Sequence, residues 1–557
     1  MEKALSITQL FTMESNATRW LQSLVALLLT AGACSVLWEL TAMHTYRSFL
    51  EAPREPSAEI FAFVAPPLVS DTPSWLETDE DEDLPTDVPS DELLHLSFLQ
   101  DACQVENNTI LPWTFGAPGN GVGLPNPDPR YSTKLVHRHD PRLLEQLRQC
   151  PEVDIYLPSS ARGPGGCADV VGPLKFLQSR LLPHWAFEVR LLDAAMQRKV
   201  GYFDLCPRTP VLFLAPEHLL KLTNLPSWSV SKPVYLMAPG LSLSNSPQKT
   251  PTNLTRSVLG RTDVVLCRTE RCDQDIKHFL LQLALKGDVD FTAKRPRVLY
   301  TGQATADPAN FARRMLGEEV MPPNPADFAY VRFTHSTRDV SSSTTQEVLK
   351  CWNKHAKELG PLDVYVLKKS DDKKPHAGWR LYGRFPGGKK PKKSELDPLQ
   401  FAKAIGQASF FVCPTANDEC LEYARASGGV IITADAYPMN ELIASPAEGV
   451  LFPTQQSLWT PPVNDTTYHS LVPEDALLLP PPSAAFAGSA LCSAVMKAKA
   501  STTLTQRMAM SETTRRQFHE DTKLFALRML ELRAFTEYER ELQQQKEQEL
   551  KQKLRHG

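Results

Sequence analysis

Two glutamates, Glu419 and Glu422, stand where a buried apolar run gives way to a helical pattern, and their carboxylates are candidate ligand-binding groups. Carboxylates accept hydrogen bonds from the hydroxyl groups of a ligand. A cation, Arg338, stands just before a second predicted helix whose start, residues 341–345, is rich in serine and threonine. A helix N-terminus beside a cation favours an anion, because its backbone N–H groups and its dipole face that ligand.

The elements that position these carboxylates run through residues 401–452. Helices are predicted over residues 401–407, 419–426 and 439–444, and buried strands over residues 409–413, 430–433 and 450–452. The strands are continuous apolar runs, as expected where helices cover both faces of a sheet. Gly428 and Gly429 suit a left-handed helix end, and Pro438 suits the first turn of the next helix. The pattern predicts a doubly wound α/β sheet that binds ligands beyond the carboxyl ends of its strands.

Residues 428–443, GGVIITADAYPMNELI, resemble the carboxyl-terminal half of the GT-B-fold retaining glycosyltransferases, the group 1-like transferases that use nucleotide sugars. Cys413-Pro414-Thr415 fits the strand end of that family. The sequence departs from the family in residues 416–421, where the loop is shorter and lacks the Gly-Phe-Gly. The resemblance implies two Rossmann-like doubly wound domains and transfer from a nucleotide sugar with no metal or other cofactor.

The resemblance also implies roles for individual residues. As the catalytic pair, Glu419 is expected to bind the donor sugar and Glu422 the ribose. The diphosphate of the donor is expected to lie at two helix starts. The residues expected to bind the donor there are Arg338, Thr344, Pro438, Asn440 and Glu441. The alternative is that the two glutamates are exposed helix acids and that Arg338 faces solvent beside ordinary Ser and Thr capping.

The preceding part of the chain has its own pattern of strands and helices. Strands are predicted over residues 153–157, 211–214, 234–237 and 264–267, with a helical segment at 174–182. Their order predicts a first Rossmann-like domain over residues 101–293. The resemblance implies that this domain is the acceptor side. The Gly-rich turn at residues 159–166 suits either a phosphate-binding loop or a plain flexible loop. A strand in residues 295–305 is expected to open the second, nucleotide-sugar domain, residues 294–500, after a hinge near residues 287–295.

The C-terminal region, residues 501–557, is predicted to be a long helix with a charged tail. Phe518, Phe525, Met529 and Leu532 are spaced to share one helix face. In GT-B proteins the chain commonly crosses back to the first domain through a terminal helix. This apolar face is therefore expected to pack partly on the first domain.

The N-terminal region predicts a membrane anchor. Residues 20–38 are an apolar run without a charged side chain, long enough to cross a hydrocarbon core of roughly 30 Å. We predict a cytoplasmic tail over residues 1–19, a transmembrane signal-anchor over residues 20–40, and an acidic, Pro-rich, disordered stem over residues 41–100. This implies a single-pass type II protein of the Golgi or endoplasmic reticulum membrane with a luminal head. A cleaved signal peptide is the alternative, since Ala31-Gly32-Ala33 resembles a cleavage site.

Sequons and cysteines favour a luminal head. Glycosylation sequons begin at Asn107, Asn253 and Asn464. Ten of the eleven cysteines follow the apolar run, which permits disulfides in an oxidising compartment. Local pairing is possible between Cys267 and Cys272 and between Cys413 and Cys420, and the alternative is that several cysteines are free buried thiols. No cysteine spacing matches a CxxC zinc site.

Composition agrees with two α/β domains and argues against nucleic acid as a partner. The chain has 557 residues, 42% of them apolar, and a net charge of −4 without a basic stripe. The leading hypothesis is a glycosyltransferase that moves a sugar from a nucleotide sugar to a luminal glycan, protein or lipid acceptor. The alternative hypothesis is a catalytically inactive GT-B-like membrane protein that binds a glycan or a partner, because positions at the expected cleft depart from the family pattern.

Overall fold

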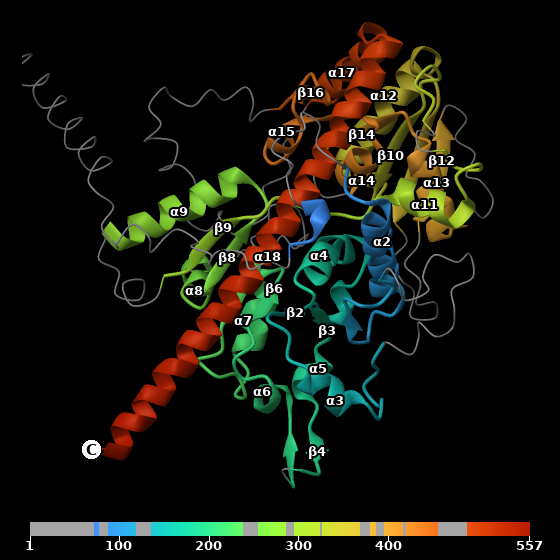
Figure 1. Ribbon diagram of the computed structural model, residues 1–557. Coiled ribbons are helices and arrows are strands. Elements are labelled where there is room, and N and C mark those ends of the chain that lie inside the picture. The colour runs from blue at the N-terminus through green and yellow to red at the C-terminus, as the bar shows by residue number, and fades with distance from the viewer. Residues whose placement is uncertain are drawn as a thin grey trace, which may run out of the picture. The chain divides into compact units, whose positions relative to one another are not determined.

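The computed structural model describes most of the chain that follows the N-terminal region. The described residues are 72–76, 87–117, 135–195, 197–237, 254–285, 295–322, 326–367, 379–385, 395–415, 419–454 and 487–556. They form two halves, each built on a seven-stranded sheet with helices packed against it (Figure 1).

The first half is a largely parallel sheet with the strand order β1-β3-β2-β6-β7-β8-β9. Its strands are β1 (Leu111–Pro112), β2 (Asp154–Tyr156), β3 (Arg180–Leu182), β6 (Val211–Phe213), β7 (Val234–Met237), β8 (Val264–Cys267) and β9 (Arg297–Tyr300). Only β1 runs antiparallel to its neighbour among these described strands. Its helices are α2 (Ser90–Val105), α3 (Leu143–Arg148), α4 (Pro164–Phe176), α5 (Trp185–Glu188), α6 (Tyr202–Leu205), α7 (Pro216–Thr223), α8 (Leu254–Leu259) and α9 (Glu270–Leu285). A separate hairpin joins β4 (Leu191–Asp193) to β5 (Arg198–Val200).

The second half has the strand order β13-β12-β11-β10-β14-β15-β16. Its strands are β10 (Phe333–Thr337), β11 (Leu362–Leu367), β12 (Trp379–Phe385), β13 (Glu395–Leu396), β14 (Phe410–Cys413), β15 (Val430–Asp435) and β16 (Gly449–Pro453). Five neighbouring strands are parallel, namely β11, β10, β14, β15 and β16, and β12 and β13 extend the sheet beside β11 as antiparallel strands. Its helices are α11 (Pro308–Leu316), α12 (Ser343–Leu359), α13 (Pro398–Gly406), α14 (Cys420–Ser427), α15 (Met439–Leu442), α17 (Gly488–Ser501) and α18 (Leu504–His556).

The doubly wound α/β prediction for residues 401–452 is confirmed. Strands β14 and β15 are buried along almost their whole length, because α14 packs on both, α17 and α18 pack on β15, and neighbouring strands flank them. Gly428 ends α14 with a φ of 74°, the left-handed conformation that a residue without a Cβ adopts at least cost. The helices and strands of this segment therefore follow from local pattern alone.

The strand expected to open the second half belongs to the first half instead. β9 pairs in parallel with β8 as the last strand of the first sheet, so this expectation is wrong. An apolar run such as Val298 and Leu299 fits any covered parallel sheet, and its sequence does not say which sheet it joins. The chain passes to the second half after β9, and of residues 287–295, where the hinge was expected, only Arg295 lies within the described residues.

The expected stem is folded near its C-terminal end. Residues 90–100 belong to α2, whose Leu93, Leu96 and Leu99 are buried in the core of the first half. Their apolar side chains supply the buried surface that the acidic stretch before them lacks. The prediction of a disordered stem as far as residue 100 is therefore wrong for this helix.

The predicted membrane anchor, residues 20–40, lies outside the described residues. Within the described part of the chain, no helix combines the length and the apolar composition that crossing a bilayer demands.

Ten cysteines form five disulfides among the described residues. The pairs are Cys103–Cys167, Cys150–Cys206, Cys267–Cys272, Cys351–Cys492 and Cys413–Cys420. The two local pairings considered from sequence are confirmed. Cys351–Cys492 joins α12 to α17 across a sequence separation of 141 residues.

Helix α18 packs on both halves (Figure 1). Phe518, Phe525, Met529 and Leu532 are all buried in the core of the first half, as predicted from their spacing. The Phe525 ring meets Phe176 of α4 edge to face, with 6.1 Å between ring centroids. On the other side, Arg425 of α14 forms an ion pair with Asp521. The helix is therefore one structural link between the two halves, beside the packing of α2 on α11.

We expect Phe525→Ala to lower the free energy of unfolding by about 3–5 kcal/mol, because it leaves a cavity in a buried helix contact. The measurement is the denaturant midpoint of the purified protein. Leu550→Ala on the same helix is the control, since Leu550 is 59% exposed and its removal opens no cavity. Truncation after Thr502 should destabilise the protein further, and an unchanged midpoint in either case would contradict the packing described.

Candidate functional site

The strand orders of the two sheets place the site. In each sheet the strand order reverses beside the first parallel strand, between β2 and β6 and between β10 and β14. Open sheets of this kind bind ligands at such reversals, beyond the carboxyl ends of the strands. Gly165 follows β2, Arg338 follows β10, and Glu419 follows β14. The loops that follow β2, β10 and β14, which are expected to surround a ligand, therefore each supply one residue to the same site.

The centre of the site is an ion pair between Arg338 and Glu419. The side chain of Glu419 is 4% exposed and that of Arg338 is 27% exposed. Glu419 has a φ of 50°, a left-handed conformation that is strained for a residue with a Cβ. It stands at the N-cap position of α14, but its carboxylate reaches Arg338 and makes no capping hydrogen bond.

Gly165, in the first turn of α4, lies directly against this ion pair. A Cβ added there would overlap both the Arg338 guanidinium and the Glu419 carboxylate. The Gly-rich turn after β2 thus becomes a close contact between the two halves, because only glycine leaves room for it. Of residues 159–166, Ser159–Ala161 form a short 3-10 helix and Pro164 to Gly166 begin α4. Whether this turn binds a phosphate stays a prediction.

Two short disulfides hold the loops of the site. Cys413 ends β14 and Cys420 begins α14, so this disulfide closes the loop that carries Glu419. Cys267 and Cys272 do the same for the loop between β8 and α9, which carries Arg268.

A second group of charged residues lies beside the first. Arg268 forms an ion pair with Asp169 of α4 at 2.5 Å, and both side chains are 5% exposed. Glu422 accepts a hydrogen bond of 2.5 Å from the side-chain amide of Gln303. Burial raises the pKa of Asp169, although Arg268 beside it opposes that shift.

The carboxyl group of Glu422 has a strongly shifted pKa. The residue as a whole is half-buried, but its carboxyl group is enclosed, and Oε2 has no hydrogen-bond partner among the described residues. Burial is the main cause that raises the pKa of Glu422 to about 8, and the negative charge of Asp169 adds to it. Glu422 is therefore protonated at neutral pH and can donate a hydrogen bond as well as accept one.

No family model matches the sequence, and no curated protein is similar to it at a significant level. Solved structures similar to the chain include the pneumococcal O-GlcNAc transferase GtfA in complex with UDP and GlcNAc (TM-score 0.32, 13% identity, 58% of this chain and 55% of that chain). The sucrose-phosphate synthase from Thermosynechococcus elongatus is another (TM-score 0.38, 10% identity, 66% of this chain and 84% of that chain). The chain spans 57% of the GtfA/B complex chain and 55% of the GtfA chain.

These scores are low, and the fold is identified by the two sheets, their matching strand reversals and the helix that joins them. The chain has the GT-B fold. The charged cluster lies between the two halves. The second half supplies Arg338, Glu419 and Glu422, and the first half supplies Gly165, Asp169 and Arg268.

The remaining residues predicted to bind the donor lie at two helix starts. At the first, Ser342 caps α12 by accepting a hydrogen bond of 3.3 Å from the Thr345 N–H, and the hydroxyl of half-buried Thr344 lies 3.3 Å from that of Ser342. The serine and threonine residues therefore do cap this helix. Arg338, however, does not face solvent as the alternative proposed, because it is paired with Glu419.

At the second helix start, Pro438 precedes α15, which is a single turn of four residues. Asn440 is exposed and donates a hydrogen bond of 3.2 Å to Asp435. Glu441 accepts a hydrogen bond of 2.5 Å from the Glu270 N–H at the start of α9 in the first half. One turn carries little helix dipole, and Glu441 contacts the first half. The donor-binding roles of Pro438, Asn440 and Glu441 stay predictions.

Asp169, Arg268 and Gln303 were not predicted. Arg268 and Gln303 follow the strands β8 and β9, so their positions at carboxyl strand ends were a usable signal. Asp169 lies on α4, and its sequence context has no feature that points to the site. Asp169 lies in the charged cluster only because the two halves, which are distant in sequence, pack together.

Among the predicted glycosylation sites, Asn107 lies half-buried in a turn after α2. Asn253 and Asn464 lie outside the described residues. Within the described part of the chain, no group of three or more His, Cys, Asp or Glu residues is arranged to hold a metal ion. The expectation of a metal-free site stays a prediction.

Gly165→Ala should separate Arg338 from Glu419, because the added methyl group would occupy their space. We expect a lower melting temperature and a loss of any ligand binding that depends on the pair. Gly163→Ala is the matched control, since a Cβ at Gly163 has no atom within 4 Å. Equal behaviour of the two variants in thermal unfolding and binding would contradict the contact.

Glu422 predicts a pH dependence of stability. The pKa of Glu422 is about 8 in the folded protein, above the ordinary value of 4.5. The proton that Glu422 retains on folding stabilises the protein fully below pH 4.5, and this stabilisation is lost as the pH rises through about 8. Glu422→Gln removes this ionisation and should flatten the decline in melting temperature over the same window. Glu549→Gln, an exposed site on α18, should leave the decline as in the unsubstituted protein. A decline of the same steepness in Glu422→Gln would show that the carboxyl is not held neutral by the fold.

Proposed function

We propose that the protein is a glycosyltransferase that moves a sugar from a nucleotide-sugar donor to a luminal glycan, protein or lipid acceptor, with retention as the family resemblance implies. The observation that carries this proposal is the convergence of Arg338, Glu419 and Glu422 with Asp169 and Arg268 at the carboxyl strand ends of both sheets. A sugar nucleotide offers hydroxyl groups for the carboxyl groups and a diphosphate for the guanidinium groups.

The mechanism follows from these charges. Arg338 stabilises the negative charge that develops on the departing diphosphate, and Glu419, released from the ion pair, accepts hydrogen bonds from the donor sugar. Glu422, which is protonated, both donates and accepts hydrogen bonds at the ribose. Enclosure between the two halves excludes water from the reactive sugar. No metal or other cofactor is invoked for these steps.

The location proposed is the lumen of the Golgi or endoplasmic reticulum, with residues 20–40 as the anchor of a type II membrane protein. Five disulfides among the described residues support an oxidising compartment. The acidic stem before α2 would hold the head away from the membrane.

A second candidate function is a GT-B-like protein without catalysis that binds a glycan or a partner. The observation that favours it is that Arg338 is already neutralised by Glu419 and that Gly165 packs against both. In an enzyme, a donor must replace these contacts. In a non-catalytic protein they would simply join the two halves.

Donor binding and turnover test the proposal. The full-length protein is screened against UDP-, GDP- and CMP-sugars by thermal shift, and donor hydrolysis is followed as a reaction that needs no known acceptor. Glu419→Gln and Glu422→Gln should each lower turnover more than tenfold, because a charged or enclosed hydrogen bond to a ligand contributes roughly 1.5–3 kcal/mol. Glu549→Gln is the control. Turnover that both variants retain would refute the site, and no binding by any donor would favour the second function.

The luminal location predicts N-linked glycans on Asn253 or Asn464. Treatment of the expressed protein with an endoglycosidase should increase its electrophoretic mobility, and Asn253→Gln together with Asn464→Gln should remove that shift. Protease digestion of intact microsomes should leave the head protected. An unchanged mobility with digestion of the head would place it on the cytoplasmic side.

A further inference from the structure

A pocket of about 520 Å³ lies on the first half, at the edge of the sheet opposite to the charged cluster. It is bordered by the amino-terminal ends of β2 and β3, since Pro151 precedes β2 and Arg180 begins β3. The side chains that matter for the argument are Trp113, Arg142, Gln146, Gln149, Gln178 and Arg180. The site described above does not use any of them.

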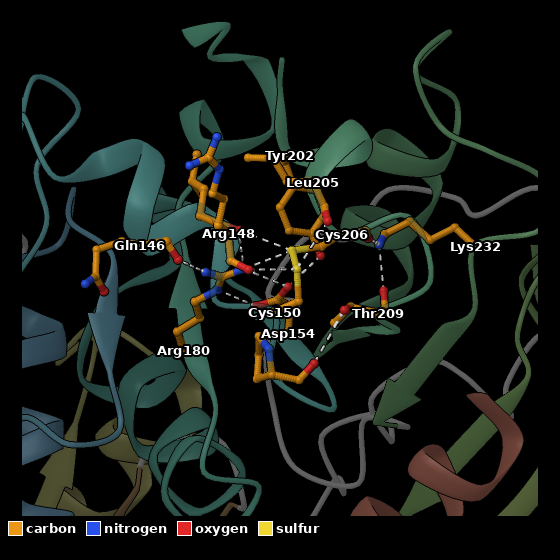
Figure 2. Close-up of a disulfide and its surroundings, with 12 residues drawn as sticks. Gln146, Arg148, Cys150, Asp154, Arg180, Tyr202, Leu205, Cys206, Thr209 and Lys232 are labelled. Atoms are coloured by element: carbon orange, nitrogen blue, oxygen red, sulfur yellow. Dashed lines mark hydrogen bonds and ion pairs between the residues drawn. A yellow bond between two sulfur atoms is a disulfide. The ribbon is translucent and has the colours of Figure 1, made fainter. Parts of the chain in front are cut away.

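The floor of the pocket is held by an ion pair, hydrogen bonds and a disulfide. Arg180 is 8% exposed and forms an ion pair with fully buried Asp154, while its guanidinium also donates to the carbonyl groups of Gln146 and Leu147. The Cys150–Cys206 disulfide fixes the segment between α3 and β2 beside this guanidinium. Figure 2 shows the carbonyl of Gln146 directed at Arg180 and its side-chain amide pointing away from it. The floor is thus a preformed structure whose own hydrogen bonds are satisfied.

The charges at the pocket are neutralised in pairs. Arg180 is paired with Asp154, and Arg142 is paired with Asp140 through two hydrogen bonds of 3.2 and 2.9 Å. Neither guanidinium is therefore a free charge for an anionic ligand. The pocket favours a neutral ligand.

Three side-chain amides and one indole ring remain for recognition. Gln146, Gln149 and Gln178 make no side-chain hydrogen bond within the described residues, and each amide offers donors and an acceptor together. The ring of half-buried Trp113 packs against the core of the first half and also lines the pocket. Adjacent sugar hydroxyls pair with an amide group through one donor and one acceptor. The C–H face of a sugar ring packs on an indole.

Gln178 lies on the wall of the pocket in a strained backbone conformation. It stands in the turn after α4 with a φ of 49°, where glycine is the residue of lowest cost. The chain keeps a long amide side chain at this strained position on the pocket wall.

From these contacts we infer that this pocket is a second carbohydrate site, which binds a neutral oligosaccharide apart from any reaction at the charged cluster. The inference goes beyond the proposed function and holds equally for the non-catalytic alternative. In a transferase, the site would bind one part of a glycan-bearing acceptor while another part of the same acceptor reaches the charged cluster.

The test uses the full-length protein in detergent on an array of neutral oligosaccharides ending in glucose, galactose, mannose or N-acetylglucosamine. Sialylated and sulfated oligosaccharides serve as acidic contrasts. The substitutions are Gln149→Ala and Gln178→Gly, the second of which removes an amide and relieves the backbone strain. Gln197→Gly is the matched control, because Gln197 has the same φ of 49° and does not line the pocket.

We expect at least one neutral oligosaccharide to bind, and both pocket variants to lose about tenfold in affinity, the effect of one or two lost hydrogen bonds. Gln197→Gly and Arg338→Ala should bind it as the unsubstituted protein does, which separates this site from the charged cluster. Binding of acidic oligosaccharides alone, no binding at all, or equal binding by the pocket variants would overturn the inference.

Discussion

The arrangement of the site depends on the packing of α18 against both halves. Its buried face fills the core beside α4, where Gly172 is needed because a Cβ there would meet the Phe525 ring and the carbonyl of Ala304. Further along the helix, Thr536 forms a hydrogen bond of 2.9 Å with Tyr235 of the first sheet. The ion pair with Arg425 attaches the same helix to α14. Because α4 carries Asp169 and α14 carries Glu422, one helix sets the distance between carboxyl groups from different sheets.

The charges between the halves follow from the cost of burial. An enclosed charge is tolerated when an opposite charge lies beside it, and Arg268 and Arg338 neutralise Asp169 and Glu419. For Glu422 the effect of burial outweighs the nearby charge of Arg268, and its carboxyl group is held neutral. A ligand with two negative charges would change this balance, since it would compete with the carboxylates for both guanidinium groups. Ligand binding and protonation at this place are therefore linked.

Residues 401–452 of the second half could be predicted from sequence, because their strands are short apolar runs bounded by glycine and proline. The two short disulfides could also be suggested from spacing. The sheet that β9 joins could not, since its apolar residues fit either sheet equally well. Residues 180–182 form a strand although a helix was predicted through them, because a leucine-rich run suits both. Asp169 and the contact of Glu441 with α9 arise only from tertiary packing.

The Cys351–Cys492 disulfide has a consequence for the integrity of the protein. It encloses β11 to β16 and the helices between them in one covalent ring. A single backbone break anywhere between these cysteines, by a protease or by chemical damage, leaves both fragments attached. A nicked molecule would thus migrate as one species on a gel until a thiol is added, and the fragments could hold their place in the second sheet after cleavage.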